Sequence, residues 1–98
     1  MTRQFIVRPE ADFDIDDAYD WYELQNPGLG TTFQQAVLAS LRKIQQHPFS
    51  YQVIHDETRH APINRFPYVL LYFVTDTTIV VTACFHDKRD PNIWQSRT

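Results

Sequence analysis

Residues 67–86 read PYVLLYFVTDTTIVVTACFH, two apolar runs separated by Asp76 and Thr77. Runs that are apolar at successive positions are typical of interior strands, which are covered on both faces. The two polar residues between the runs predict a tight hairpin turn. The sequence therefore predicts two neighbouring antiparallel strands, over 67–75 and 78–86, in the interior of a sheet.

The turn also predicts which side chains share a face of this hairpin. With two turn residues, Thr75 lies opposite Thr78, and opposite residues point to the same side. One side then carries Tyr68, Leu70, Tyr72, Val74, Ile79, Val81, Ala83 and Phe85. The other side carries Val69, Leu71, Phe73, Val80, Thr82, Cys84 and His86. We expect the first side to face the main core, because Thr82, Cys84 and His86 interrupt the second.

Two helical patterns precede the hairpin. After Pro9, one apolar stripe recurs every three or four residues and consists of Ala11, Ile15, Ala18 and Tyr22. The motif NPGLG (26–30) breaks it, and a second stripe follows with Leu29, Phe33, Val37, Leu41 and Ile44, which Pro48 ends. The short connection predicts an antiparallel helical hairpin.

The remaining segments complete the expected architecture. Residues 3–8 form a short apolar strand, and residues 58–64 form a strand that Pro62 assigns to the edge of the sheet. The order is β-αα-βββ, which predicts an α+β fold with an antiparallel sheet packed on the helical hairpin. A length of 98 residues predicts a single domain over 1–98.

Composition narrows the classes of protein. The single cysteine, Cys84, excludes an internal disulfide. The N-terminal residues 1–14 lack the apolar core of a signal peptide, and no apolar segment reaches the ~20 residues of a membrane span. We therefore expect a cytoplasmic protein with no membrane contact. The formal net charge is −3, whereas proteins that bind nucleic acid without a partner protein usually carry an excess of basic residues. We therefore expect no autonomous nucleic-acid binding.

The polar residues suggest little catalytic chemistry. No ligand spacing typical of a metal site joins the candidates His55, Asp56, His60, His86 and Asp87, and no serine lies in a nucleophile elbow, so we expect no metal and no cofactor. Metal-free RNA cleavage needs an acid–base group and guanidinium groups for the phosphate. The residues of these types form the set Arg59, Arg65, His86 and Arg89. Charged strand ends explain the same residues, so both interpretations stay open.

Several short motifs follow one another along the chain. They are RPEA (8–11), WYE (21–23), PGLGTTF (27–33), HP (47–48), NRFPYVLLY (64–72) and a spaced set of His86, Arg89, Asp90, Pro91, Trp94 and Arg97. In this order they resemble the RelE/ParE superfamily of type II toxin–antitoxin toxins, and most of all its ParE-like, plasmid-stabilisation branch. The resemblance implies the β-αα-βββ fold and a toxin neutralised by a cognate antitoxin, ParD-like or another small protein, in a hetero-oligomer.

The resemblance also implies two classes of target. RelE-like members cleave mRNA in the ribosomal A site, whereas characterised ParE-like members poison DNA gyrase by binding it. Ribosome-dependent cleavers carry a His-Arg pair where this chain has Tyr68 and Val69, and their late catalytic histidine falls near Asp87, one position after His86. A shift of one residue turns a strand side chain to the other face.

These departures favour a binding-type toxin with no catalytic residues of its own, and the resemblance implies gyrase as its target. The first alternative is a metal-independent mRNA interferase acting on the ribosome through Arg59, Arg65, His86 and Arg89. The second alternative is a binding module of the same fold that has lost its toxicity.

Partner binding is expected on exposed apolar and cationic surfaces. The helices can cover only one face of the sheet, which would leave an apolar patch on the other. Trp21 on the helical hairpin and a C-terminal end with cations and Trp94 are further candidates. The predicted partner-binding residues are Trp21, Val69, Leu71, Phe73, Val80, Lys88, Arg89, Trp94 and Arg97.

Overall fold

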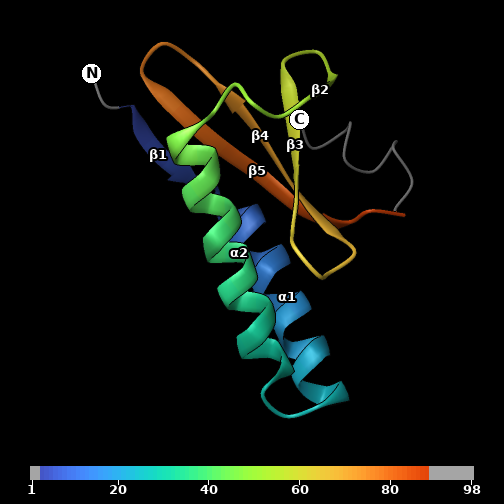
Figure 1. The fold of residues 1–98 in the computed structure, drawn as a ribbon. Coiled ribbons are helices and arrows are strands. Elements are labelled where there is room, and N and C mark those ends of the chain that lie inside the picture. The colour runs from blue at the N-terminus through green and yellow to red at the C-terminus, as the bar shows by residue number, and fades with distance from the viewer. Residues whose placement is uncertain (1–2, 89–98) are drawn as a thin grey trace.

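The computed structural model describes residues 3–88, which form a helical hairpin and a five-stranded sheet (Figure 1). The elements in chain order are β1 (Gln4–Val7), α1 (Pro9–Gln25), α2 (Leu29–Gln46), β2 (Val53–His55), β3 (Thr58–Pro62), β4 (Tyr68–Val74) and β5 (Thr78–His86). The sheet order is β1-β5-β4-β3-β2, in which β1 runs parallel to β5 and the other neighbours are antiparallel. The predicted α+β class is confirmed.

Strand β2 was not predicted from the sequence. It pairs with β3 through Val53 opposite Arg59 and His55 opposite Thr58, so β3 lies inside the sheet and its prediction as an edge strand is wrong. Pro62 is the last residue of β3, beyond the part that pairs with β2, where its missing N–H removes no bond of that ladder.

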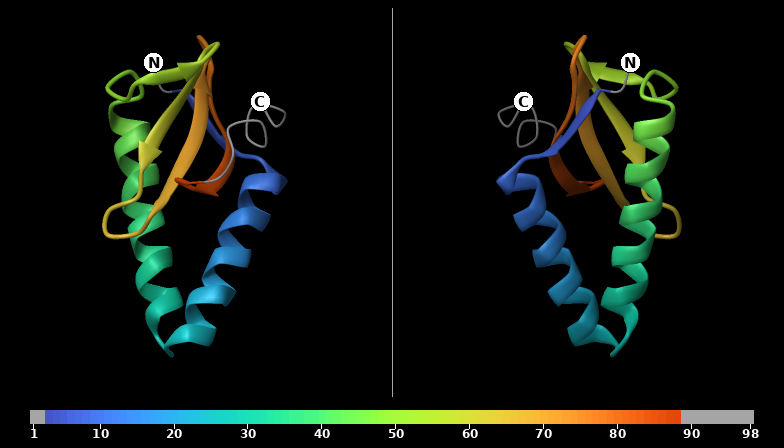
Figure 2. Two further views of the ribbon diagram at one scale, coloured as in Figure 1. Left: turned by 90° about the vertical axis from the view of Figure 1, so that its right-hand side faces the viewer. Right: turned by 90° about the vertical axis from the view of Figure 1, so that its left-hand side faces the viewer.

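Both predicted helical stripes face the core. The buried members are Ala11, Ile15, Ala18 and Tyr22 of α1 and Phe33, Val37 and Ile44 of α2. They form one cluster with residues of the sheet that include Leu70, Tyr72, Ile79 and Val81. The two helices diverge from their connecting loop toward the sheet, so the loop is the part of the hairpin farthest from it (Figure 2).

The helix connection is fixed by one carboxylate and one close contact. Gly28 has a φ of 93°, which glycine adopts without a steric penalty, and it precedes the first residue of α2. The Glu23 carboxylate accepts hydrogen bonds from the N–H groups of Gly28 and Gly30, both at 2.9 Å. A Cβ on Gly30 would lie 2.8 Å from the carbonyl oxygen of Tyr19, so the helices meet here at a distance that only glycine permits.

A β-bulge changes the register of the central hairpin. Near the turn the predicted pairing is confirmed, since Val74 lies opposite Ile79 and Tyr72 opposite Val81. Farther along, Leu71 lies opposite Ala83, so β5 contributes one extra residue, Thr82, between these pairs. The Thr82 hydroxyl donates to the carbonyl oxygen of Leu71 at 3.3 Å.

Beyond the bulge, the predicted sides of β5 are therefore exchanged. Cys84 joins the main core instead of facing away from it, and His86 lies opposite Tyr68. Ala83 and Phe85, which were predicted in the main core, turn to the second face of the sheet. A single extra residue is sufficient for this exchange because successive strand side chains point to opposite faces.

The exchange also corrects the prediction of an exposed apolar patch. Ala83 and Phe85 pack around Leu71, which is only 1% exposed, and Val80 is only 8% exposed. Val69 and Phe73 are half-buried, and the guanidinium of Arg8 lies 5.6 Å from the centre of the Phe73 ring. The second face is therefore a small second core with a partly exposed margin.

Candidate functional site

The cationic residues of the predicted nuclease set occupy separate places. Arg59 on β3 donates from Nη1 to the carbonyl oxygens of Tyr51 at 2.6 Å and Phe49 at 3.3 Å, and its guanidinium lies 5.2 Å from the Phe49 ring centre. These contacts hold the loop after α2 against the sheet. Arg65 lies in the loop between β3 and β4 and lines a cavity beside α2.

His86 lies at the end of β5 near α1. Its ring centre is 5.4 Å from that of Tyr68, and its Nδ1 accepts a hydrogen bond from the backbone N–H of Lys88 at 3.2 Å. A ring nitrogen that accepts this bond leaves the proton of neutral histidine on Nε2. The Oδ1 atom of Asp87 lies 3.5 Å from the same Nδ1.

Arg59, Arg65 and His86 line three different cavities that have no lining residue in common. Arg59 is opposite Tyr72 on β4 and His86 is opposite Tyr68, which separates them by roughly 13 Å along the strand direction alone. Arg89 lies outside the described residues. The structure therefore does not bring together the three members of this set that it describes.

The cavity at His86, here called the aromatic pocket, has a volume of about 530 Å³ and is lined by Asp17, Ala18, Trp21, Tyr22, Pro67, Tyr68 and His86. Trp21 is 54% exposed and meets Tyr22 edge to face, with ring centres 5.1 Å apart. Tyr22 in turn lies 6.0 Å from Tyr68. Exposed ring surface next to the Asp17 carboxylate suits an apolar or cationic group of a partner.

One acidic residue of α1 supports β5 beside this pocket. The ladder between β1 and β5 ends at Val7 opposite Val81, and the N–H of Cys84 donates to the Asp14 carboxylate at 3.1 Å. Burial raises the pKa of the Cys84 thiol to about 12, and the charge of Asp14 adds to this shift. A thiol with so high a pKa stays protonated near neutral pH and is therefore not a nucleophile.

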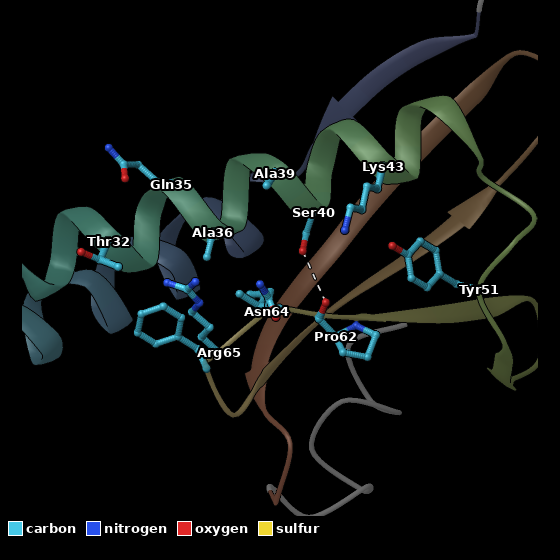
Figure 3. Close-up of a pocket in the computed structure, with 12 residues that line it drawn as sticks. Thr32, Gln35, Ala36, Ala39, Ser40, Lys43, Tyr51, Pro62, Asn64 and Arg65 are labelled. Atoms are coloured by element: carbon cyan, nitrogen blue, oxygen red, sulfur yellow. Dashed lines mark hydrogen bonds between the residues drawn. The ribbon is translucent and has the colours of Figure 1, made fainter.

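The cavity at Arg65, here called the α2 groove, has a volume of about 740 Å³. Its residues are Thr32, Gln35, Ala36, Ala39, Ser40, Lys43, Tyr51, Pro62, Ile63, Asn64, Arg65 and Phe66. The Ser40 hydroxyl donates to the carbonyl oxygen of Pro62 at 3.4 Å, which ties α2 to the end of β3 (Figure 3). Both charged residues of the groove are cations, Lys43 and Arg65.

The predicted partner-binding residues differ in accessibility. Trp21 and Lys88 are exposed, Val69 and Phe73 are half-buried, and Leu71 and Val80 are buried. Arg89, Trp94 and Arg97 lie outside the described residues. Within residues 3–88 no group of three or more His, Cys, Asp or Glu side chains is arranged to hold a metal ion, and no helix is long and apolar enough to cross a membrane.

Comparison with known proteins identifies the family. The family described as "ParE toxin of type II toxin-antitoxin system, parDE" matches residues 5–91. The chain belongs to this ParE toxin family. A solved structure entitled "Chromosomal ParDE TA system from P. aeruginosa" has a chain with the same fold, with a TM-score of 0.78 and 17% sequence identity, over 87% of this toxin and 96% of that chain. The comparison with curated protein sequences returned no match.

The α2 groove of this ParE toxin was missed in the analysis of the sequence, except for Arg65. Lys43 and Asn64 join the groove only because the β3–β4 loop folds back beside α2, a long-range contact that no local pattern predicts. One signal was available in the sequence, since residues 24–55 and 58–75 contain no aspartate or glutamate.

Proposed function

We propose that this ParE toxin acts by binding a macromolecular target, DNA gyrase, and that it does not itself cleave RNA. The observation that carries the proposal is the separation of Arg59, Arg65 and His86 into three cavities. Acid–base cleavage requires its groups within about 3 Å of the reacting atoms of one substrate. The resemblance to characterised ParE-like toxins supports gyrase as the target.

Supercoiling of plasmid DNA by gyrase tests the proposed target. We expect the purified toxin to inhibit supercoiling, and His86→Ala and Arg65→Ala to leave growth arrest after expression largely intact. Primer extension on translated mRNA tests the alternative. Cuts within codons that disappear in His86→Ala, while the melting temperature of the toxin is unchanged, would show a ribosome-dependent nuclease instead. Normal growth without the antitoxin would favour a non-toxic binding module.

Antitoxin binding is proposed for the exposed and half-buried members of the predicted partner set. Trp21, Val69, Phe73 and Lys88 present accessible surface, and a disordered antitoxin segment that folds on contact needs such apolar anchors. Leu71 and Val80 would then support this surface from below. Arg89, Trp94 and Arg97 remain candidates for the same role.

Phe73→Asp tests this surface. We expect the variant to fold, because the Arg8 guanidinium beside the ring can pair with the new carboxylate, and to recover less antitoxin on copurification. Thr77→Asp adds the same charge at the exposed hairpin turn and serves as the control. Equal antitoxin recovery with Phe73→Asp and the wild-type toxin would remove Phe73 from the interface.

A further inference from the structure

The formal net charge of −3 conceals a segregation of charge between the two helices. Helix α1 contains seven acidic residues, Glu10, Asp12, Asp14, Asp16, Asp17, Asp20 and Glu23, and no lysine or arginine. Helix α2 contains no acidic residue and carries Arg42 and Lys43. The two arms of the hairpin therefore carry charges of opposite sign.

The α2 groove concentrates the positive side of this segregation. Lys43 enters it from α2 and Arg65 from the β3–β4 loop, and none of the lining residues is acidic. Figure 3 shows the Arg65 side chain directed toward α2 at one part of the groove, and the Lys43 side chain extending from α2 at another, with its amino group between Ser40 and Tyr51. Two positive charges thus stand apart along one cavity, with neutral residues between them.

Neither cation is used inside the described structure. Among residues 3–88, the ion pairs join His55 to Asp56 and His86 to Asp87, and neither involves Lys43 or Arg65. Arg65 also has a φ of 75°, a left-handed conformation that is strained for a non-glycine residue. The strained backbone at Arg65 therefore holds an exposed side chain at the groove, and this side chain forms no ion pair within the described residues.

The walls of the groove suit a polypeptide. Ala36 and Ala39 are small and let a partner approach α2 closely, while the partly buried Phe66 supplies apolar contact. Neutral donors and acceptors such as Asn64 can pair with backbone groups. A protein that binds a nucleic-acid backbone typically makes roughly six to ten phosphate contacts through cationic side chains. The two cations of this groove are too few for that role. The combination favours a peptide with carboxylates over RNA or DNA.

We infer that the α2 groove binds an acidic segment of the antitoxin, with carboxylates on Lys43 and Arg65 and apolar side chains on the alanine face of α2. The inference rests on the antitoxin partnership of the proposed function and not on the gyrase target. Arg65 can hold a carboxylate through two parallel hydrogen bonds, whereas Lys43 acts as a point charge. The carboxylates of α1 would repel the same acidic segment. Electrostatic repulsion therefore also favours binding of the segment along α2 over binding along α1.

Charge reversal with a matched control tests the inference. The probe is the antitoxin encoded beside the toxin gene, and binding is titrated calorimetrically against the refolded toxin at two salt concentrations. We expect Lys43→Glu and Arg65→Glu each to weaken binding about tenfold, and the double variant more, with a smaller dependence of affinity on salt. Arg42→Glu changes the same charge on the adjacent exposed residue, which does not line the groove, and should alter affinity less than about twofold.

Three results would overturn the inference. The first is wild-type affinity of the double variant for the antitoxin while circular dichroism shows an unchanged fold. The second is an equal loss with Arg42→Glu, which would indicate a general effect of net charge. The third is unchanged antitoxin affinity together with lost binding to RNA, DNA or a second copy of the toxin. Gyrase inhibition by the free double variant, measured in parallel, reports on the proposed target separately, because the inference leaves it unchanged.

Discussion

The two sides of the helical hairpin share one core and differ in surface chemistry. On the α1 side, the aromatic pocket is lined by one carboxylate, Asp17, of a helix with seven acidic residues, and on the α2 side, cations line a groove without carboxylates. The same ring cluster supports both cavities, since Tyr22 and Tyr68 line the pocket and Phe66 lines the groove. The difference shows that the core determines where the cavities lie, whereas exposed residues determine which charge each one accepts.

Phe33→Ala removes a ring from the core that the two sides share and should have the largest effect on the free energy of unfolding. Phe33 is fully buried, and its ring centre lies 5.2 Å from Tyr22, 5.1 Å from Phe66 and 5.3 Å from Tyr68. Loss of the ring leaves a cavity, so we expect urea unfolding to show a loss of about 3–5 kcal/mol. Phe33→Leu should cost clearly less. A loss below about 1 kcal/mol in Phe33→Ala would mean that the two sides are supported independently.

Gly30→Ala separates the two sides at their connection and should have the second largest effect. An added methyl group would meet the Tyr19 carbonyl oxygen at 2.8 Å, a backbone atom that cannot move away without shifting α1. We expect a net loss of about 1–3 kcal/mol, although alanine is the better helix former. Thr31→Ala, at an exposed neighbouring position, is the control. Unchanged or higher stability of Gly30→Ala would show that the helix contact is adjustable.

The α1 side should respond to alkaline pH through Cys84. Its folded-state pKa of about 12 lies above the ordinary value of 9.0, so its contribution to stability is complete below pH 9 and is lost as the pH rises toward 12. Between pH 8 and pH 10 we expect urea unfolding to show a loss of about 1.4 kcal/mol from this group. Cys84→Ala should remove that part of the pH dependence. Equal losses of unfolding free energy between pH 8 and pH 10 in Cys84→Ala and in the wild-type protein would show that the Cys84 thiol is not the group responsible.

Much of the fold could be predicted from the sequence because its signals are local. Helical stripes, the helix break at 26–30 and the two-residue turn are properties of neighbouring residues, and the structure confirms each one. The bulge at Thr82 is not local, since it is a property of the pairing between β5 and β4, and it exchanged the sides of Ala83 and Cys84. Strand β2 has only three residues and carries no alternating pattern.

The candidate surfaces were less predictable. Trp21 was found because a large exposed ring can be recognised from its position outside the helical stripe. Arg65 was selected for its chemistry, yet the cavity that it lines also includes Lys43 of α2 and does not include His86. Which cations share a cavity depends on the path of the β3–β4 loop, and sequence spacing does not contain that information.

Trp21→Ala should change stability least and sharpens the comparison most. The side chain is 54% exposed, so we expect the free energy of unfolding to change by less than about 1 kcal/mol, whereas antitoxin affinity should fall. Leu24→Ala, at a position on α1 that is 84% exposed and lines none of the cavities described above, should leave affinity unchanged. Equal affinity losses in both variants would remove the aromatic pocket from the interface.

Combining Trp21→Ala with Lys43→Glu asks whether one antitoxin segment contacts both sides. The residues lie on different helices and line cavities with no residue in common, so their effects on the binding free energy should add within about 0.5 kcal/mol. Additivity means that the aromatic pocket and the α2 groove bind separate parts of the antitoxin. A coupling above about 1 kcal/mol would mean that one continuous, cooperatively ordered segment crosses the hairpin and that the two surfaces act as a single site.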